Sequence, residues 1–271
     1  MAEKTIENFI KWYSETGIAD VGIVGGKNAA LGEMYSNLVP LGINVPDGFA
    51  LTASAYRHFF KETGLDNRVQ KILADLDTSN IRNLQIRAKK VREAILQAAL
   101  PRDLEEAIVE AYVGLEKKYG KDTDVAVRSS ATAEDLPGAS FAGQQETYLN
   151  VCGISNVLLA TKKCIASLFT DRAISYRTDK GFSHFDAALS VGIQRMVRSD
   201  LSSSGVAFTI DTETGFDKVI VINGIYGLGE FIVQGEVIPD EFIIFKPALE
   251  NGSKNPVIGR NIGKKNIKLV Y

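Results

Sequence analysis

The sequence predicts an α+β fold in two parts, with helices dominating residues 1–188 and strands dominating residues 189–271. Apolar residues recur at alternating steps of four and three between residues 66 and 120, which is the spacing of amphipathic helices. Short β-rich runs separated by Gly, Asn and Asp fill the C-terminal part. A block of helices followed by a block of strands is typical of an α+β arrangement.

The composition is that of a globular protein with a sizeable core. The chain has 271 residues, of which 45% are hydrophobic and 24% charged. This length suits one large domain or two modest ones.

The first elements of the helix-rich part surround a glycine-containing loop. Thr52 or Ser54 would cap the helix that follows the turn, because a hydroxyl can accept from free backbone amides. In chain order, we expect a helix over 5–13, the loop, a helix over 28–39, a turn at 46–48 and a strand over 49–51.

The middle of the chain carries the clearest helical pattern. Pro101 is suited to open one helix and Gly120 to end it. Two more helices are expected over 155–166 and from Asp171. The apolar face of the helix before Pro101 consists of Leu84, Ala88, Val91, Ile95 and Ala98.

Strand patterns begin after Ala188, which marks the expected boundary between the two parts. The last pattern runs to Tyr271 with no turn or polar tail, so we expect the second part to be an incomplete lobe. The runs are VGIQRMV, GVAFTI, KVIVIN, DEFIIFK and IKLVY.

Charge and hydropathy exclude several classes of protein. A net charge of −2 and a pI near 5.8 give no general attraction to nucleic acid or to an anionic membrane. No apolar run approaches the roughly 20 residues that span a bilayer, and the amino end lacks the apolar core of a signal peptide. Cys152 and Cys164 have the spacing of neither a disulfide framework nor a zinc site. We therefore expect a cytoplasmic protein in which both thiols are reduced.

Arg128 is the first candidate for binding phosphate. The alternation at Val125 and Val127 predicts a strand, and the small and polar residues that follow predict that Arg128 lies where strand becomes loop. A planar guanidinium suits bidentate capture of phosphate oxygens, and the small residues of the loop would let its backbone close over a polyphosphate. A surface arginine beside a flexible loop is the alternative. The loop residues are Gly138, Ala139, Ser140, Ala142 and Gly143.

Lys27 is the second candidate. Gly25 and Gly26 precede it and a run of helix formers follows, which would place its ammonium near a helix N-terminus. Free amides and the helix dipole favour anions there. The sequence contains no G-x-x-x-x-G-K-[ST] spacing, so this is not a Walker A loop.

These segments resemble the N-terminal ATP-binding region of the phosphoenolpyruvate synthase family, whose relatives include pyruvate phosphate dikinase and rifampicin phosphotransferase. The resemblance covers nearly the whole chain, and the sequence segment IDTETGF favours the synthase. It implies an ATP-grasp fold, in which two α+β lobes hold the nucleotide. The matching segments span residues 21–34, 42–59, 124–151, 168–177, 191–216 and 222–247.

The resemblance also implies a set of site residues. Lys27 and Arg128 would be the catalytic phosphate contacts, with Gly138, Gly143 and Thr147 in a lid over the phosphates. Backbone groups of the linker between the lobes would bind the edge of adenine, and a carboxylate would accept hydrogen bonds from the ribose hydroxyls. Strand packing is the alternative for Thr147 and for the linker, and a solvated loop for the carboxylate. The linker residues are Gln194, Met196 and Val197, and the carboxylate is Glu230.

The chemistry implied is phosphotransfer from ATP with Mg²⁺, whose ligands we expect outside this chain. In the full family a histidine is phosphorylated, and pyruvate, ATP and water become phosphoenolpyruvate, AMP and phosphate. The partners would be the phosphohistidine and pyruvate-binding domains. His58 and His184 do not match the phosphoacceptor context, so we expect them to be structural. The alternatives are the same part of a rifampicin-type phosphotransferase and a nucleotide-binding module without catalysis.

Overall fold

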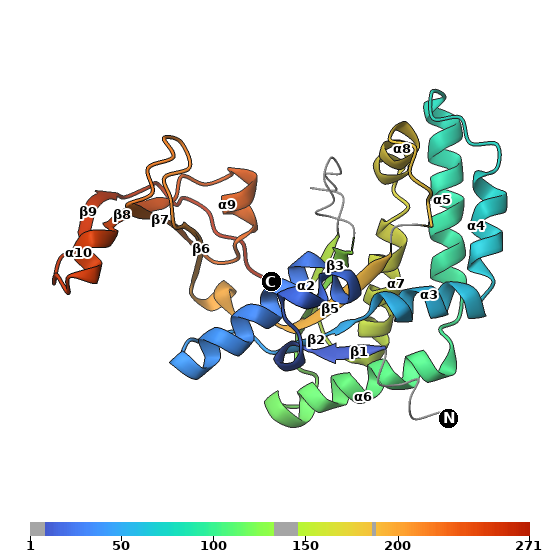
Figure 1. Ribbon diagram of the computed structural model, residues 1–271, viewed down its shortest axis with the longest axis horizontal. Coiled ribbons are helices and arrows are strands. Elements are labelled where there is room, and N and C mark those ends of the chain that lie inside the picture. Colours follow the sequence, from blue (N-terminus) through green and yellow to red (C-terminus); the bar gives the residue numbers. More distant parts are fainter. Residues whose placement is uncertain (1–8, 133–145, 186–187) are drawn as a thin grey trace. The chain divides into compact units, whose positions relative to one another are not determined.

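The computed structural model describes residues 9–132, 146–185 and 188–271 (Figure 1). The chain divides into two compact units, the first ending at Met196 and the second running from Val197 to Tyr271. The division therefore falls after Met196, whereas the sequence patterns suggested a boundary near Ala188. The strand between these two positions belongs to the sheet of the first unit.

The first unit is built on an antiparallel sheet. Among the described residues the sheet has five strands in the order β1-β2-β5-β3-β4. The strand that comes last in the chain, β5, thus lies in the middle, between β2 and β3. The strands are β1 (Ile10–Trp12), β2 (Gly48–Leu51), β3 (Val125–Ala131), β4 (Thr147–Val151) and β5 (Leu189–Arg195).

One face of this sheet packs against most of the helices of the unit. Alternate residues of β3 and β5, among them Val127 and Val191, join the apolar faces of these helices in one core. The helical tract expected between 66 and 120 is confirmed, and Thr52 caps α3 by accepting from the amide of Ala55. The helices are α3 (Ala53–Glu62), α4 (Leu65–Leu73), α5 (Ile81–Gln97), α6 (Arg102–Tyr119), α7 (Ile154–Ser167) and α8 (Asp171–Asp179).

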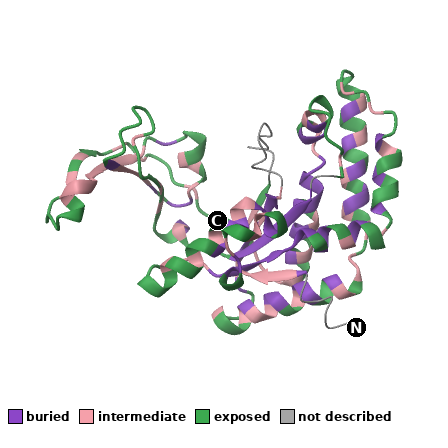
Figure 2. Ribbon diagram, in the orientation of Figure 1, coloured by how far each residue is buried: buried purple, intermediate pink, exposed green. Residues whose placement is uncertain are grey.

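The opposite face of the sheet is covered by α2 (Val21–Leu38), which contacts β2, β3 and β5. A smaller core forms there from Tyr13, Val24, Ala29 and Ala50. Figure 2 shows the inner strands β2, β3 and β5 largely buried, because both faces of the sheet are covered there, whereas β1 and β4 are half-buried or exposed. The short 3₁₀ helices are η1 (Tyr13–Glu15), η2 (Ile18–Asp20), η3 (Val39–Leu41) and η4 (Ser199–Leu201).

The expectation of a helix over residues 5–13 is wrong for its described part. Ile10–Trp12 forms β1, which pairs with β2 in antiparallel register. The apolar residues there also fit a strand, and pairing with the edge of a sheet outweighs the helical spacing of a segment this short.

The second unit contains a second antiparallel sheet. Among the described residues it has four strands in the order β6-β7-β8-β9. The expected run IKLVY forms an isolated bridge from Leu269 to Gly227 instead of a strand. The sequence did not predict β9, in which Gly259 and Arg260 interrupt the apolar pattern. The elements are β6 (Ser203–Phe208), β7 (Val219–Tyr226), α9 (Glu230–Gln234), β8 (Asp240–Phe245), α10 (Lys246–Glu250) and β9 (Val257–Asn261).

This second unit buries little of its apolar surface. Most residues of β7 and β8 are half-buried, and large side chains such as Ile258 and Val233 are 63% and 80% exposed. In Figure 2 the unit is accordingly mostly pink and green. Within the described ranges, no helix of either unit is long and apolar enough to cross a membrane.

Both histidines have protein partners. The Nε2 atom of His58 lies 3.0 Å from the carboxylate of Asp103. The Nδ1 atom of His184 accepts a hydrogen bond of 3.2 Å from Nε of Arg177, a side chain that is fully buried. This geometry requires a neutral His184, since a protonated ring could not accept.

We expect the His184 contact to make the folded state sensitive to acid. Burial, with a further contribution from the charge of Arg177, lowers the pKa of His184 from 6.5 to about 4. Between these values the unfolded chain binds a proton that the folded chain does not, so the free energy of unfolding should fall as pH drops from about 6.5 to about 4. Urea unfolding at several pH values would measure this slope.

The His184→Asn variant is the matched comparison, because its amide oxygen can accept from Arg177 without titrating. Its unfolding free energy should fall less steeply below pH 6.5. Equal slopes in the two proteins would contradict the assignment of this acid sensitivity to His184.

Candidate functional site

Arg128 is the fourth residue of the seven in β3 and lies well inside the sheet. Its Cα partners are Thr147 on β4 and Gly192 on β5. The expectation that the strand ends at Arg128 is wrong, because the ladder continues through Ser129, Ser130 and Ala131. Small polar residues can continue a strand when neighbours on both sides supply backbone partners.

Strand alternation places Arg128 on the face of the sheet that α2 covers. Val127 belongs to the large core on the other face, so Arg128 and Ser130 point towards α2. Thr147 is directly opposite Arg128 and shares its face. Arg128 is half-buried and Thr147 exposed. The structure therefore brings these two predicted residues together.

Lys27 lies in the first turn of a helical segment on the same face. Gly25 interrupts α2 with φ 74° and ψ 161°, and the helix resumes after it. A Cβ at Gly25 would lie 2.3 Å from Oγ of Ser130, so this kink is pressed against the end of β3. The expected position of Lys27 near a helix N-terminus is confirmed, and the helix start lies beside the strand that carries Arg128.

A buried tyrosine, Tyr13, is influenced by the charges of Arg128 and Asp47. Tyr13 is fully buried and donates to Oδ1 of Asn28 at 3.2 Å. Burial raises the pKa of Tyr13 strongly, while the charge of Arg128 acts against that shift and the charge of Asp47 adds to it. Tyr13 therefore stays protonated, and it can act as a hydrogen-bond donor at any physiological pH.

The residues expected to form the linker fall on both sides of the division between the units. Gln194 lies inside the sheet, paired with Gly48 and with Ala126, and its side chain donates to the carbonyl of Pro46. Met196 lies just beyond β5, and its amide donates to the carbonyl of Asp124 at 2.9 Å. Val197 opens the second unit and is 60% exposed.

The remaining predicted site residues are placed only in part. Glu230 is the exposed first residue of α9 in the second unit. Gly138 and Gly143 lie outside the described residues. Within the described ranges, no group of three His, Cys, Asp or Glu residues could hold a metal ion.

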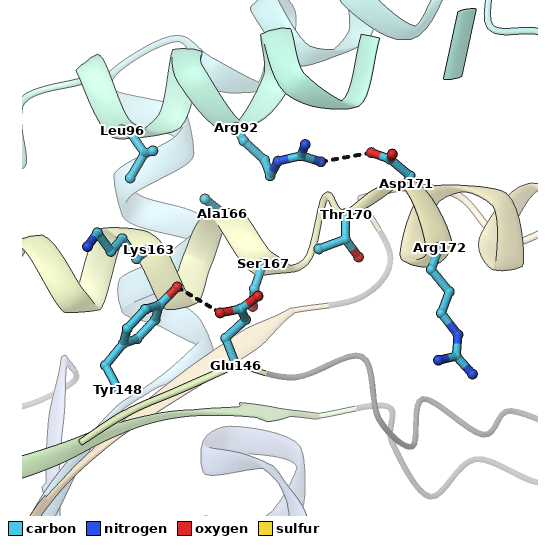
Figure 3. Close-up of a pocket in the computed structure, with 10 residues that line it drawn as sticks. All are labelled: Arg92, Leu96, Glu146, Tyr148, Lys163, Ala166, Ser167, Thr170, Asp171 and Arg172. Atoms are coloured by element: carbon cyan, nitrogen blue, oxygen red, sulfur yellow. Dashed lines mark hydrogen bonds and ion pairs between the residues drawn. The ribbon is translucent and has the colours of Figure 1, made fainter. Parts of the chain in front are cut away.

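A cavity of about 520 Å³ lies on the other side of β4, between α5, α7 and α8 (Figure 3). Two polar contacts join residues that line it. Arg92 lies 3.1 Å from Asp171, and the hydroxyl of Tyr148 donates to Glu146 at 3.0 Å. Because side chains alternate, Tyr148 faces α7 whereas Thr147 faces α2. The sheet therefore separates this cavity from Lys27 and Arg128.

Sequence reasoning missed the polar residues beneath Lys27. Asn28, Ser130 and Ser190 are all buried, and Asn28 on α2 donates hydrogen bonds to Ser130 on β3 and to Ser190 on β5. The sequence held only a partial signal, because Val24 and Asn28 have the four-residue spacing of one helix face but Gly25 interrupts the helix between them. An asparagine on an apolar face needs buried partners.

A family model described as pyruvate phosphate dikinase, AMP/ATP-binding domain, matches residues 21–271. The chain belongs to this family. The matched range contains every candidate site residue named above, so the resemblance drawn from the sequence is confirmed for the family.

Curated relatives of this AMP/ATP-binding domain are named phosphoenolpyruvate synthase. The protein from Synechocystis sp. is 56% identical over 97% of this chain and 32% of its own length. Those from Aquifex aeolicus and Escherichia coli are 55% and 50% identical, each over 97% of this chain, and over 31% and 33% of their own lengths. The chain thus spans about a third of the length of the relatives it matches.

Proposed function

We propose that this AMP/ATP-binding domain holds the phosphates of ATP on the α2 face of its first sheet. The observation that supports this most directly is the pairing of Arg128 with Thr147 on the face where the helix start bearing Lys27 meets β3. Two cations, a hydroxyl and a helix N-terminus on one surface favour a polyphosphate.

Each group would have a separate part in binding and transfer. The guanidinium of Arg128 would take two phosphate oxygens at once, and its position inside a strand limits its freedom to move. Lys27 would add a point charge together with the free amides of its helix. Both would stabilise the charge that builds on the transferred group. The Thr147 hydroxyl would donate to a phosphate oxygen.

The rest of the nucleotide would be held as in an ATP-grasp fold, with lobes close to those expected from the sequence (1–188 and 189–271) but with β5 in the first lobe. Two antiparallel sheets with covering helices are compatible with this fold. Backbone groups of Met196 and Val197 would hydrogen-bond to the edge of adenine. Gln194, which precedes them on β5, would complete this part of the site. Glu230 would hold the ribose, and Gly138 and Gly143 would lie in the lid over the phosphates.

The whole protein would be a phosphoenolpyruvate synthase, which is the name of the relatives reported above. It would use ATP to phosphorylate a histidine and convert pyruvate, ATP and water into phosphoenolpyruvate, AMP and phosphate. The phosphohistidine and pyruvate-binding domains would be its partners within the same protein. Mg²⁺ would enter with ATP, and its protein ligands would come from outside this chain.

Titration calorimetry of this chain with Mg·ATP and with AMP tests the proposal. We expect tighter binding of ATP than of AMP, and a loss of about tenfold in ATP affinity for Lys27→Ala, because one charged hydrogen bond contributes about 1.5–3 kcal/mol. The affinity for AMP should change less, since AMP lacks the outer phosphates.

Lys89→Ala is the control for the loss of a positive charge. Lys89 is 71% exposed, lies on α5 and pairs with Glu93 at 3.8 Å, so its removal should leave both affinities unchanged. Equal affinities for ATP and AMP in the unaltered chain would argue against a phosphate site on this face.

A further inference from the structure

We infer that Asn28 is a positioning residue that fixes the helix start carrying Lys27. The inference rests on the proposed function, because it gives Asn28 a role through Lys27 and the phosphates. Asn28 follows Lys27 directly in the resumed helix, and its side chain is 2% exposed. Successive helical residues point about 100° apart, so Asn28 can face the sheet while Lys27 faces elsewhere.

The carboxamide of Asn28 makes three hydrogen bonds, and both of its N–H groups have acceptors. Its Nδ2 atom donates to the carbonyl of Val24 and to Oγ of Ser190, each at 3.0 Å. Its Oδ1 atom accepts from the hydroxyl of Tyr13 at 3.2 Å. The backbone amide of Asn28 also points to Oγ of Ser130 at 3.5 Å. The contact from Val24 to Asn28 spans the kink at Gly25 and so ties its two sides together.

The partners of Asn28 are themselves fixed in the sheet. Ser190 is fully buried on β5 and donates from Oγ to the carbonyl of Leu51 at the end of β2. Ser130 is Cα partner to Ser190 and lies two residues after Arg128 on β3. The network therefore connects the helix start of Lys27 with the strand of Arg128 through buried, hydrogen-bonded groups.

The sheet leaves room for this side chain at one position. Gly192 lies on β5 directly opposite Arg128, and a Cβ there would lie 2.2 Å from Oδ1 of Asn28 and 2.8 Å from the hydroxyl of Tyr13. Asn28 and Tyr13 thus fill the space above the one neighbour of Arg128 that has no side chain. A shift of Asn28 would move the helix start relative to Arg128.

A double-mutant cycle separates positioning from simple stabilisation. Tyr13→Phe removes the donor to Oδ1 with little change of shape, and Asn28→Ala removes the hub itself. Each is made with Lys27 present and in the Lys27→Ala background, and ATP and AMP affinities are measured. We expect a loss of about 3- to 10-fold in ATP affinity with Lys27 present, and no further loss once Lys27 is replaced.

Tyr112→Phe is the matched control. Tyr112 is 1% exposed, and its hydroxyl donates to the carbonyl of Thr123 at 2.8 Å in a part of the fold remote from α2. This variant should lose stability in urea while keeping its ATP affinity. A purely structural role for Asn28 would make Tyr13→Phe behave in the same way.

The possible results are distinguishable. Equal losses of ATP affinity with and without Lys27 would overturn the inference while leaving the phosphate site intact. A Lys27→Ala variant that binds ATP normally, or an unaltered chain that does not bind ATP, would overturn the proposed function and the inference with it. If Asn28→Ala does not fold, Tyr13→Phe decides the question alone.

Discussion

Replacing Arg128 by alanine should lower the affinity of the chain for ATP about 10- to 100-fold, because hydrogen bonds to charged groups contribute about 1.5–3 kcal/mol. The loss for AMP should be smaller. Arg128→Lys should recover only part of the affinity, since an ammonium cannot take two oxygens in the plane that a guanidinium offers. Calorimetric titration of the three proteins with Mg·ATP and AMP would measure the effect.

Arg102→Ala is the control for the loss of an arginine. Arg102 is 91% exposed and pairs with Glu106 at 2.7 Å on α6, away from α2. Its removal should leave ATP affinity unchanged. If Arg128→Ala binds ATP as well as the unaltered chain does, Arg128 is a structural residue of β3 and the site lies elsewhere.

Gly25→Ala should be the most damaging single methyl substitution near the site. The backbone at Gly25 has φ 74°, and the added Cβ would lie 2.3 Å from Oγ and 2.6 Å from the carbonyl oxygen of Ser130. A left-handed backbone costs a residue with a side chain about 1–2 kcal/mol, and overpacking typically costs about 1–3 kcal/mol more. We expect the free energy of unfolding in urea to fall by about 2–5 kcal/mol and ATP affinity to fall as Lys27 is displaced.

Gly22→Ala tests whether the effect belongs to the kink. Gly22 lies in the same helix, and a methyl group there would meet no atom within 4 Å. Alanine favours a helix over glycine by about 0.5–1 kcal/mol, so this variant should be neutral or slightly more stable. Similar losses in the two variants would show that α2 is sensitive along its length and would remove the special role of the kink.

Periodicity predicted the helices of this fold well and the strand ends poorly. The apolar pattern before and after Pro101 predicted α5 and α6, because many apolar residues in each segment recur at the spacing of one helix face. The end of β3 was misplaced because Ser129 and Ser130 are poor strand formers by themselves and are held by neighbours on β5 and beside β4.

The residues of the candidate site were likewise predicted in part. Charge and glycine spacing singled out Lys27 and Arg128, since both signals are local in the sequence. Asn28 was not predicted, because its hydrogen-bond partner Ser190 is 162 residues away in the sequence. The four-residue spacing from Val24 indicates a buried position for Asn28, but no local pattern identifies a partner across such a distance.

The central place of β5 affects how the first unit can form during synthesis. Its strand leaves the ribosome after every other strand of that sheet, yet both β2 and β3 depend on it for pairing. Until Arg195 has emerged, the earlier strands expose unpaired backbone edges and contacts between distant residues cannot close. A nascent chain that ends at Ala188 would thus lack the middle of its sheet, and vectorial folding of this unit must wait for its last strand.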